Sequence, residues 1–182
     1  MRKALIAFAA IALALSMSTT AASAPAASSS KITHRMQLRA VWDGEVRYPD
    51  CPLDQISPPD TGDLIQIDDP TGCWYGPVDG DIDGTIAFWE TATNFVVGDV
   101  EYFFEVFTFL PDSGGVIYGV DEGIFLLRSP FPFTANGWVT ATSDAWVSLR
   151  GAHYFETGRT SDINLWPITA KGTKVYFTKA TE

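Results

Sequence analysis

The sequence has little positive charge, little cysteine and little histidine. Its 182 residues include 12 Lys and Arg against 22 Asp and Glu, with two Cys and two His, and the formal net charge is −10. Surfaces that bind nucleic acid or anionic lipid need a basic patch to neutralise phosphate, so nucleic acid and membranes are not expected partners of the mature chain. Also missing are a G-x-S-x-G elbow, a P-loop, a G-x-G-x-x-G turn and an H-E-x-x-H pair. The sequence therefore carries none of these signatures of hydrolases, nucleotide-binding proteins or zinc proteases.

The longest apolar run lies near the N-terminus and is too short to span a bilayer. Two basic residues precede an unbroken apolar run at 4–15, and small residues follow it. A membrane span needs roughly 20 apolar residues, whereas this arrangement is typical of a secretory signal peptide. We therefore expect residues 1–26 to be a signal peptide, cut within 22–27. Residues 27–182 would then form a single secreted domain, extracellular or periplasmic.

The two cysteines bracket a stretch that is rich in proline and glycine. Cys51 and Cys73 are the only cysteines in the chain, and an oxidising compartment favours their pairing. Closing a loop of this length stabilises a fold by roughly 3 kcal/mol in the chain-entropy model. A metal pair or a catalytic thiol is the alternative, but two distant cysteines without a nearby histidine make a poor zinc site. We expect a structural disulfide and a loop at 51–73.

Beyond the signal peptide the sequence alternates with a period of two. At 32–42 apolar and polar residues take turns, as in a strand with one solvated face. Seven further segments have strand character, at 64–67, 82–91, 100–110, 116–127, 138–149, 153–157 and 175–178. Turn signals such as Asn136-Gly137 separate them. The pattern predicts an all-β fold, a closed antiparallel barrel of about eight strands, with a sandwich as the less favoured alternative.

One expected strand, at 100–110, is apolar on both faces and contains two carboxyls. Glu101 and Glu105 share a face with Phe103 and Phe107. If that face points inward, the carboxyls lie in an apolar chamber where burial raises their pKa values. If it points outward, they are solvated side chains between packed rings. An eight-stranded barrel can be filled by side chains or can hold one small ligand.

The run at 138–155 resembles the late strand pair of allene oxide cyclase and dirigent-type barrels. Arg150-Gly151 and Tyr154 match the ending of that pair, while 142–144 replaces the family's Gly-Thr-Gly turn. With the order of the segments upstream, the resemblance covers roughly residues 80–157. It implies an eight-stranded barrel, often a homotrimer, that guides cyclisation, isomerisation or coupling of an apolar molecule without a cofactor.

These observations predict a secreted barrel that binds a small apolar molecule. Cofactor-free cyclase or isomerase activity is the further expectation. In that case Glu101, Glu105 or Glu122 would transfer the proton, and Arg150 or His153 would orient a polar substituent.

The alternative function is that of a secreted carbohydrate-binding or other non-catalytic β-domain. The chain has six Trp, and Trp74-Tyr75 would form an exposed stacking platform, although the core also uses aromatic residues. A glycosidase needs two carboxyls about 5 to 9.5 Å apart. Glu101 and Glu105 on one extended strand would be roughly 13 Å apart, so a glycosidase would need carboxyls from separate strands.

A further motif matches a calcium-binding loop. Asp79, Asp81 and Asp83, with Gly84 and Glu90, satisfy the pattern D-x-[DN]-x-[DN]-G-x5-E. Alternating carboxylates suit a hard cation. In a strand at 85–91, however, Glu90 would lie roughly 20 Å from Gly84. We therefore expect an acidic turn that enters a strand, with calcium binding as the less favoured alternative and no other cofactor.

Overall fold

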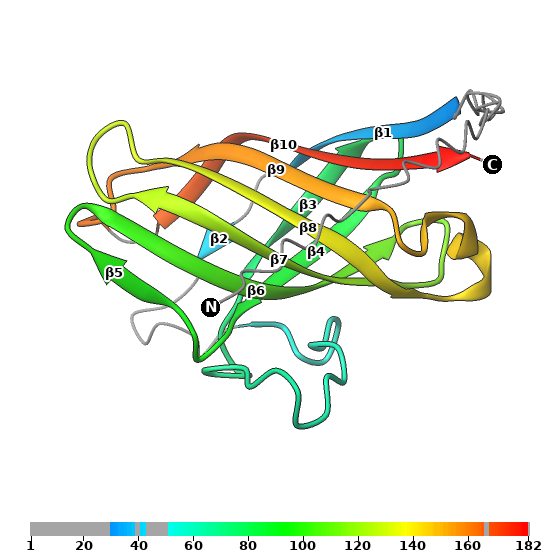
Figure 1. Ribbon diagram of the computed structural model, residues 1–182, viewed down its shortest axis with the longest axis horizontal. Coiled ribbons are helices and arrows are strands. Elements are labelled where there is room, and N and C mark those ends of the chain that lie inside the picture. Colours follow the sequence, from blue (N-terminus) through cyan, green and yellow to red (C-terminus); the bar gives the residue numbers. More distant parts are fainter. Residues whose placement is uncertain (1–29, 39–40, 43–50, 166–167, 182) are drawn as a thin grey trace, which may run out of the picture.

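The computed structural model describes residues 30–38, 41–42, 51–165 and 168–181, so the expected signal peptide lies outside the described residues. The elements are β1 (Ser30–Leu38), β2 (Val41–Trp42), β3 (Trp74–Gly80), β4 (Gly84–Glu90), β5 (Phe95–Val97), β6 (Val100–Pro111), β7 (Ile117–Leu126), β8 (Pro132–Thr142), the 3-10 helix η1 (Asp144–Leu149), β9 (His153–Thr160) and β10 (Ile168–Thr181) (Figure 1). The prediction of an all-β fold is confirmed. Within the described residues no helix has the length and apolar character needed to cross a membrane.

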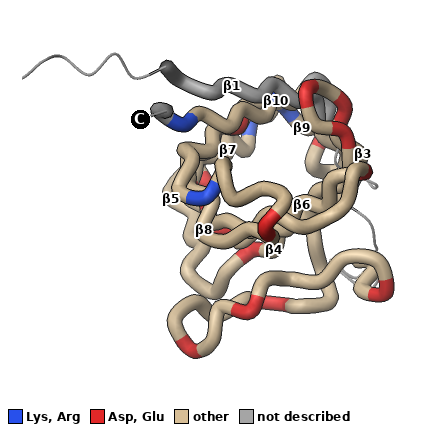
Figure 2. Tube along the Cα trace, turned by 90° about the vertical axis from the view of Figure 1, so that its right-hand side faces the viewer, with Lys and Arg blue, Asp and Glu red and all other residues tan. Residues whose placement is uncertain are grey.

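All strand pairs are antiparallel and belong to one sheet, which curls around an interior (Figure 2). Seven strands form a half-barrel, in the order β3, β4, β6, β7, β8, β9, β10. Its edge strands β3 and β10 share no pairing among the described residues; β1 and β2 bridge them. Few residues form this bridge, because β1 pairs with β3 only through residues 36–38 and β2 pairs with β3 only through residues 41–42. The predicted closed barrel is therefore present only in part.

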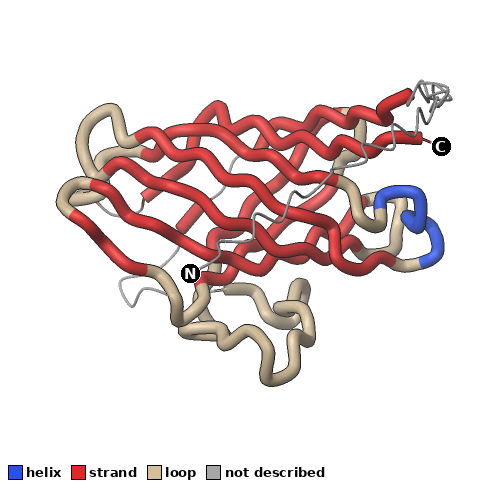
Figure 3. Tube along the Cα trace, viewed as in Figure 1, coloured by secondary structure: helices blue, strands red, loops and turns tan. Residues whose placement is uncertain are grey.

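The helix η1 lies at one end of the sheet (Figure 3). At this end the interior is filled by apolar side chains. Every second strand residue points inward, and the ring of Phe107 lies 4.7 Å from that of Tyr154 and 6.4 Å from that of Phe177, between centroids. Buried Leu149 of η1 and half-buried Trp146 cover this end. The buried cluster comprises Val78, Ile82, Ile86, Phe88, Phe107, Phe109, Ile117, Val139, Leu149, Ala152, Tyr154, Ala170, Val175 and Phe177. Each large buried side chain contributes roughly 1.5–3 kcal/mol.

The predicted disulfide between Cys51 and Cys73 is confirmed. The loop that it closes lies against the outside of the sheet (Figure 1). There Ile56 packs in a second cluster with Trp89 of β4 and Val106 of β6. The interior covers one face of β6 and this loop covers the other, which explains why 100–110 is apolar on both faces.

Three predicted local features differ from the structure. The segment 64–67 is a loop, with one isolated bridge from Ile67 to Thr91, because its isoleucines pack on the outer cluster and not in the sheet. Asn136-Gly137 lies inside β8 and is not a turn. Gly137 is opposite Asp121, and a Cβ at that position would lie 2.6 Å from the Asp121 Cβ. The strand expected at 138–149 ends at Thr142, and η1 follows.

Candidate functional site: an acidic cavity inside the sheet

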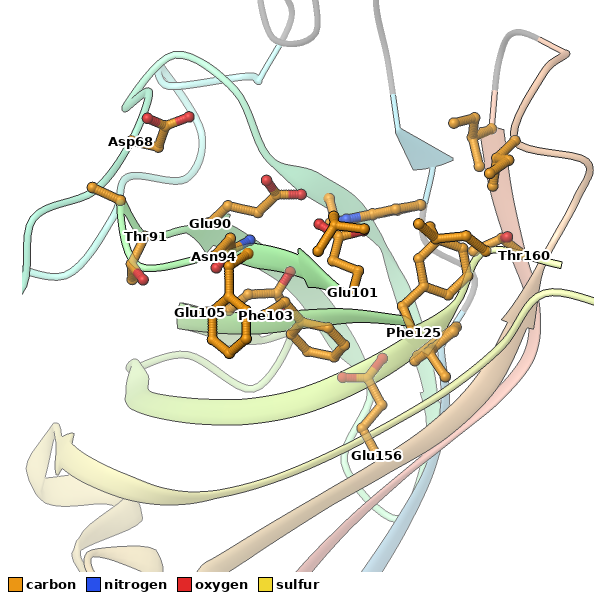
Figure 4. A pocket seen from close by; sticks show the side chains of 18 residues that line it. Asp68, Glu90, Thr91, Asn94, Glu101, Phe103, Glu105, Phe125, Glu156 and Thr160 are labelled. Carbon is orange, nitrogen blue, oxygen red and sulfur yellow. The ribbon is translucent and has the colours of Figure 1, made fainter. Parts of the chain in front are cut away.

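The other half of the interior, away from η1, contains a cavity of about 520 Å³. Residues of β5 and of the β7–β8 and β9–β10 connections contribute to its wall. Its aromatic residues are Trp74, Phe95, Phe103, Phe125 and Phe133, and its acidic residues are Asp68, Glu90, Glu101, Glu105 and Glu156. Among the described residues that line it, none is Lys, Arg or His. Figure 4 shows the carboxyls of Glu90, Glu101, Glu105 and Glu156 around one space.

Strand register brings three carboxyl side chains into a row, which we call the acid row: Glu90, Glu105 and Asp121. Glu90 of β4 is directly opposite Glu105 of β6, and Glu105 is directly opposite Asp121 of β7. Directly opposed residues have Cβ atoms about 4.5–5.5 Å apart, and like charges in such positions destabilise a sheet. When these carboxyls are ionised, their repulsion lowers the free energy of unfolding.

Aromatic rings flank the acid row where β7 has glycine. A Cβ at Gly119 would lie 2.2 Å from the Phe107 ring, and one at Gly123 would lie 2.4 Å from the Phe103 ring. The two rings therefore lie flat against β7 on either side of Asp121. That residue is 4% exposed, and neither of its carboxyl oxygens has a hydrogen-bond partner among the described residues. An unpartnered buried carboxyl is energetically costly, so its surroundings favour the protonated form.

A third buried carboxyl, that of Glu156, approaches from β9. The Tyr154 hydroxyl donates a hydrogen bond of 2.5 Å to Glu156 Oε2. Burial raises the pKa of Glu156 from 4.5 to about 7, and the Tyr154 hydrogen bond, which stabilises the carboxylate, opposes that rise. Glu156 therefore exchanges its proton close to neutral pH.

The pKa values of Glu105 and Asp121 are also well above their usual range. For Glu105 burial is the largest cause, and the charges of Asp121 and Glu156 come next. Burial and then the charge of Glu156 raise the pKa of Asp121. Each carboxylate makes ionisation of the next one harder, so the group holds protons that isolated carboxyls would release.

The structure brings two of the five predicted catalytic residues to the cavity. Glu101 and Glu105 line it, so the inward orientation of their face is the observed one. Glu122 is exposed on the outer face of β7. Arg150 is exposed after η1 and donates from Nη2 to the Thr142 carbonyl at 3.1 Å. His153 packs edge-on against the exposed Trp138 ring, with centroids 5.1 Å apart. These last three residues are not in the cavity lining.

The predicted calcium loop is an acidic turn between β3 and β4. Asp79, Asp81 and Asp83 are all exposed, and Asp83 Oδ1 accepts a hydrogen bond of 2.9 Å from the Gly80 N–H. Within the described part of the chain no three His, Cys, Asp or Glu side chains are grouped so that they could hold a metal ion. Glu90, the last residue of the motif, lines the interior cavity instead.

The stacking platform expected at Trp74-Tyr75 is not formed. Trp74 lines the cavity, whereas Tyr75 packs on the outer cluster with Trp89. Neighbouring residues of a strand point to opposite faces, so the two rings cannot stack on one ligand. The carbohydrate-binding alternative therefore has no stacking platform at Trp74-Tyr75.

Sequence reasoning did not find the site roles of Asp121, Glu156 and Tyr154. A signal was present in the alternation of Tyr154 with Glu156 and in the glycines on either side of Asp121. What the sequence does not contain is the strand register that aligns Glu90, Glu105 and Asp121.

No protein-family model, no curated protein and no solved structure matches this chain. Function is therefore inferred from the cavity, and the resemblance to allene oxide cyclase and dirigent-type barrels stays a prediction.

Proposed function

We propose that the protein binds a small organic molecule with a largely apolar body in the acidic cavity. A cavity of about 520 Å³ falls within the 300–1,000 Å³ typical of small-molecule sites. Its wall joins aromatic rings to a few polar groups, which is the usual composition of such sites. The disulfide supports action outside the reducing cytoplasm.

We further propose that the buried carboxyls catalyse a proton shift in the bound molecule, as in a cofactor-free isomerase or cyclase. The supporting observation is that Glu105 and Glu156 line the cavity, where burial raises the pKa of Glu105 well above its usual range and that of Glu156 to about 7. One carboxylic acid would donate a proton to one atom of the molecule, and a neighbouring carboxylate would remove a proton from another. The molecule's charge and oxidation state are then unchanged, so the reaction needs no cofactor.

Two tryptophan substitutions in the β9–β10 connection test the binding site. Ile163 lines the cavity, whereas Leu165, two residues away, is 65% exposed and does not line it. Ile163→Trp should fill the cavity and abolish binding of a neutral aromatic probe, 2-phenylethanol, in calorimetric titrations. Leu165→Trp should leave that binding intact. Equal binding by both variants would contradict the proposed location.

Proton transfer is tested by the molecule that the protein itself retains. Native mass spectrometry of protein purified from its own culture medium should show an adduct of a few hundred daltons. That molecule, once identified, should exchange hydrogen for deuterium in D₂O with wild-type protein and much more slowly with Glu105→Gln or Glu156→Gln. Unchanged exchange in both variants would contradict the catalytic part of the proposal.

A further inference from the structure

The charge of the cavity wall indicates which molecules it favours; this inference rests on the proposed function. Five carboxyl side chains line the cavity, and Asp121 lies directly beside one of them, Glu105, in the acid row. No basic side chain contributes to the lining among the described residues. A wall with this excess of acidic side chains favours a positively charged ligand.

Asp121 gives the strongest support for a cationic ligand. It is 96% buried, faces the interior on the same side of β7 as Gly119 and Gly123, and has no hydrogen-bond partner for either carboxyl oxygen among the described residues. Buried carboxyls are normally hydrogen-bonded or paired with a cation. Asp121 is directly opposite Glu105 of β6 and Gly137 of β8, and the charge of Glu156 also acts on it.

The distribution of these carboxyls suits an organic cation better than a metal ion. They are spread over β4, β6, β7 and β9, and no three of the described acidic side chains converge as metal ligands. An ammonium group can interact with several carboxylates at longer distances, and its apolar substituents can contact aromatic faces. Phe103, Phe125 and Phe133 supply such faces in the same wall.

We propose that the ligand of the cavity is an organic cation, an amine or ammonium group on an apolar body, whose positive charge lies against Glu105 and Glu156, with Asp121 directly beside Glu105. Binding of the cation would favour ionisation of these carboxyls, so protons would be released as the ligand enters. Affinity should fall as the pH is lowered, because Glu105, Asp121 and Glu156 lose negative charge. The other acidic side chains in the wall of the cavity are Asp68, Glu90 and Glu101. The Tyr154 hydroxyl remains a donor, because burial raises the pKa of Tyr154.

Two probes of similar size but different charge test this inference. These are 2-phenylethylammonium, which is positively charged at pH 7.5, and the neutral 2-phenylethanol. Calorimetric titration of the wild-type protein should give at least tenfold tighter binding of the ammonium, which corresponds to about 1.4 kcal/mol. In buffers of different ionisation enthalpy, the ammonium titration should show proton release and the alcohol titration should show none.

Variants locate the charge preference in the cavity. Glu105→Gln and Asp121→Asn should each lower ammonium affinity by about tenfold and leave alcohol affinity within about twofold. These substitutions remove repulsion, so both variants should fold. Glu122→Gln removes one charge from the outer face of β7 and is the matched control; it should leave both affinities unchanged.

The outcomes separate the two proposals. If the alcohol binds as tightly as the ammonium, the cationic ligand is wrong and the proposed binding function stands. If the ammonium preference persists in both interior variants and disappears at high salt, the preference comes from the overall negative charge and this inference is again wrong. If neither probe binds at millimolar concentration, the proposed function itself is contradicted.

Discussion

The two halves of the interior are built by the same strands and differ in almost every physical property. Towards η1 the inward face of β6 contains Phe107 and Phe109, both fully buried among other rings. Towards β5 the same face contains Glu101 and Glu105 and borders a cavity. The apolar half supplies burial energy, whereas the acidic half accumulates repulsion and buried unpartnered carboxyls. The fold thus tolerates a destabilised region at one end because the other end holds the strands together, a division expected at functional sites.

Truncation of a ring should cost more in the apolar half than beside the cavity. Phe107→Ala removes a fully buried ring and should lower the free energy of unfolding by about 3–5 kcal/mol. Phe103 borders the cavity, where neighbouring space already exists, so Phe103→Ala should cost less. Urea denaturation of both variants measures the difference. An equal or greater loss for Phe103→Ala would contradict the division of the interior.

The acidic half should make the protein more stable in mild acid. The pKa of Glu156 is about 7 in the folded chain against 4.5 ordinarily. Below pH 4.5 both the folded and the unfolded chain hold the Glu156 proton, and the contribution of Glu156 to the free energy of unfolding is complete. As the pH rises from 4.5 through 7 the unfolded chain loses the proton first, and about 3 kcal/mol of stability is lost. Glu105 and Asp121 shift in the same direction.

Urea denaturation at pH 5 and pH 8 measures this effect. Wild-type protein should be more stable at pH 5, and Glu156→Gln should reduce the difference between the two values. Glu122→Gln, on the outer face, should keep the wild-type difference. Greater stability at pH 8 than at pH 5 would show that the pKa values of the interior carboxyls are not raised in the folded chain.

The smallest expected effect concerns the hydrogen bond that joins the two halves. Tyr154 packs with Phe107 in the apolar half and donates to Glu156 in the acidic half. Tyr154→Phe keeps the ring and removes the donor, so the pKa of Glu156 should rise above about 7 and stability should fall by about 1 kcal/mol. Thermal denaturation and NMR titration measure both. Tyr102→Phe, at a partly exposed outer position, is the control and should change neither.

Alternation predicted the class of fold and showed which residues of β6 share a face, because each depends only on residues close in sequence. It left open whether that face points inward. The strand at 100–110 differs from β6 by a single residue. Strand β3 was missed because Gly76-Pro77 indicates a break, yet Pro77 pairs with Thr85 in the sheet. Asn136-Gly137 was misread as a turn because the need for glycine there comes from Asp121 on another strand.

The candidate site was less predictable because its residues are brought together by the register between paired strands. Glu90 and Glu105 are neighbours only because residues 84–90 pair with 105–111. Asp121 faces the interior and Glu122 faces solvent, although the two carboxyls are adjacent in the sequence. The glycines at 119 and 123 set that orientation, since they admit the rings of Phe107 and Phe103.

The most direct test of the account is an NMR titration of the Glu156 carboxyl carbon in the wild-type protein, alone and with 2-phenylethylammonium. The account predicts a pKa of about 7 for Glu156 in the free protein and a lower value when the cation is bound. A pKa near 4.5 in the free protein, or no change of the Glu156 pKa when the cation binds, would contradict an acidic cavity that binds a positively charged ligand.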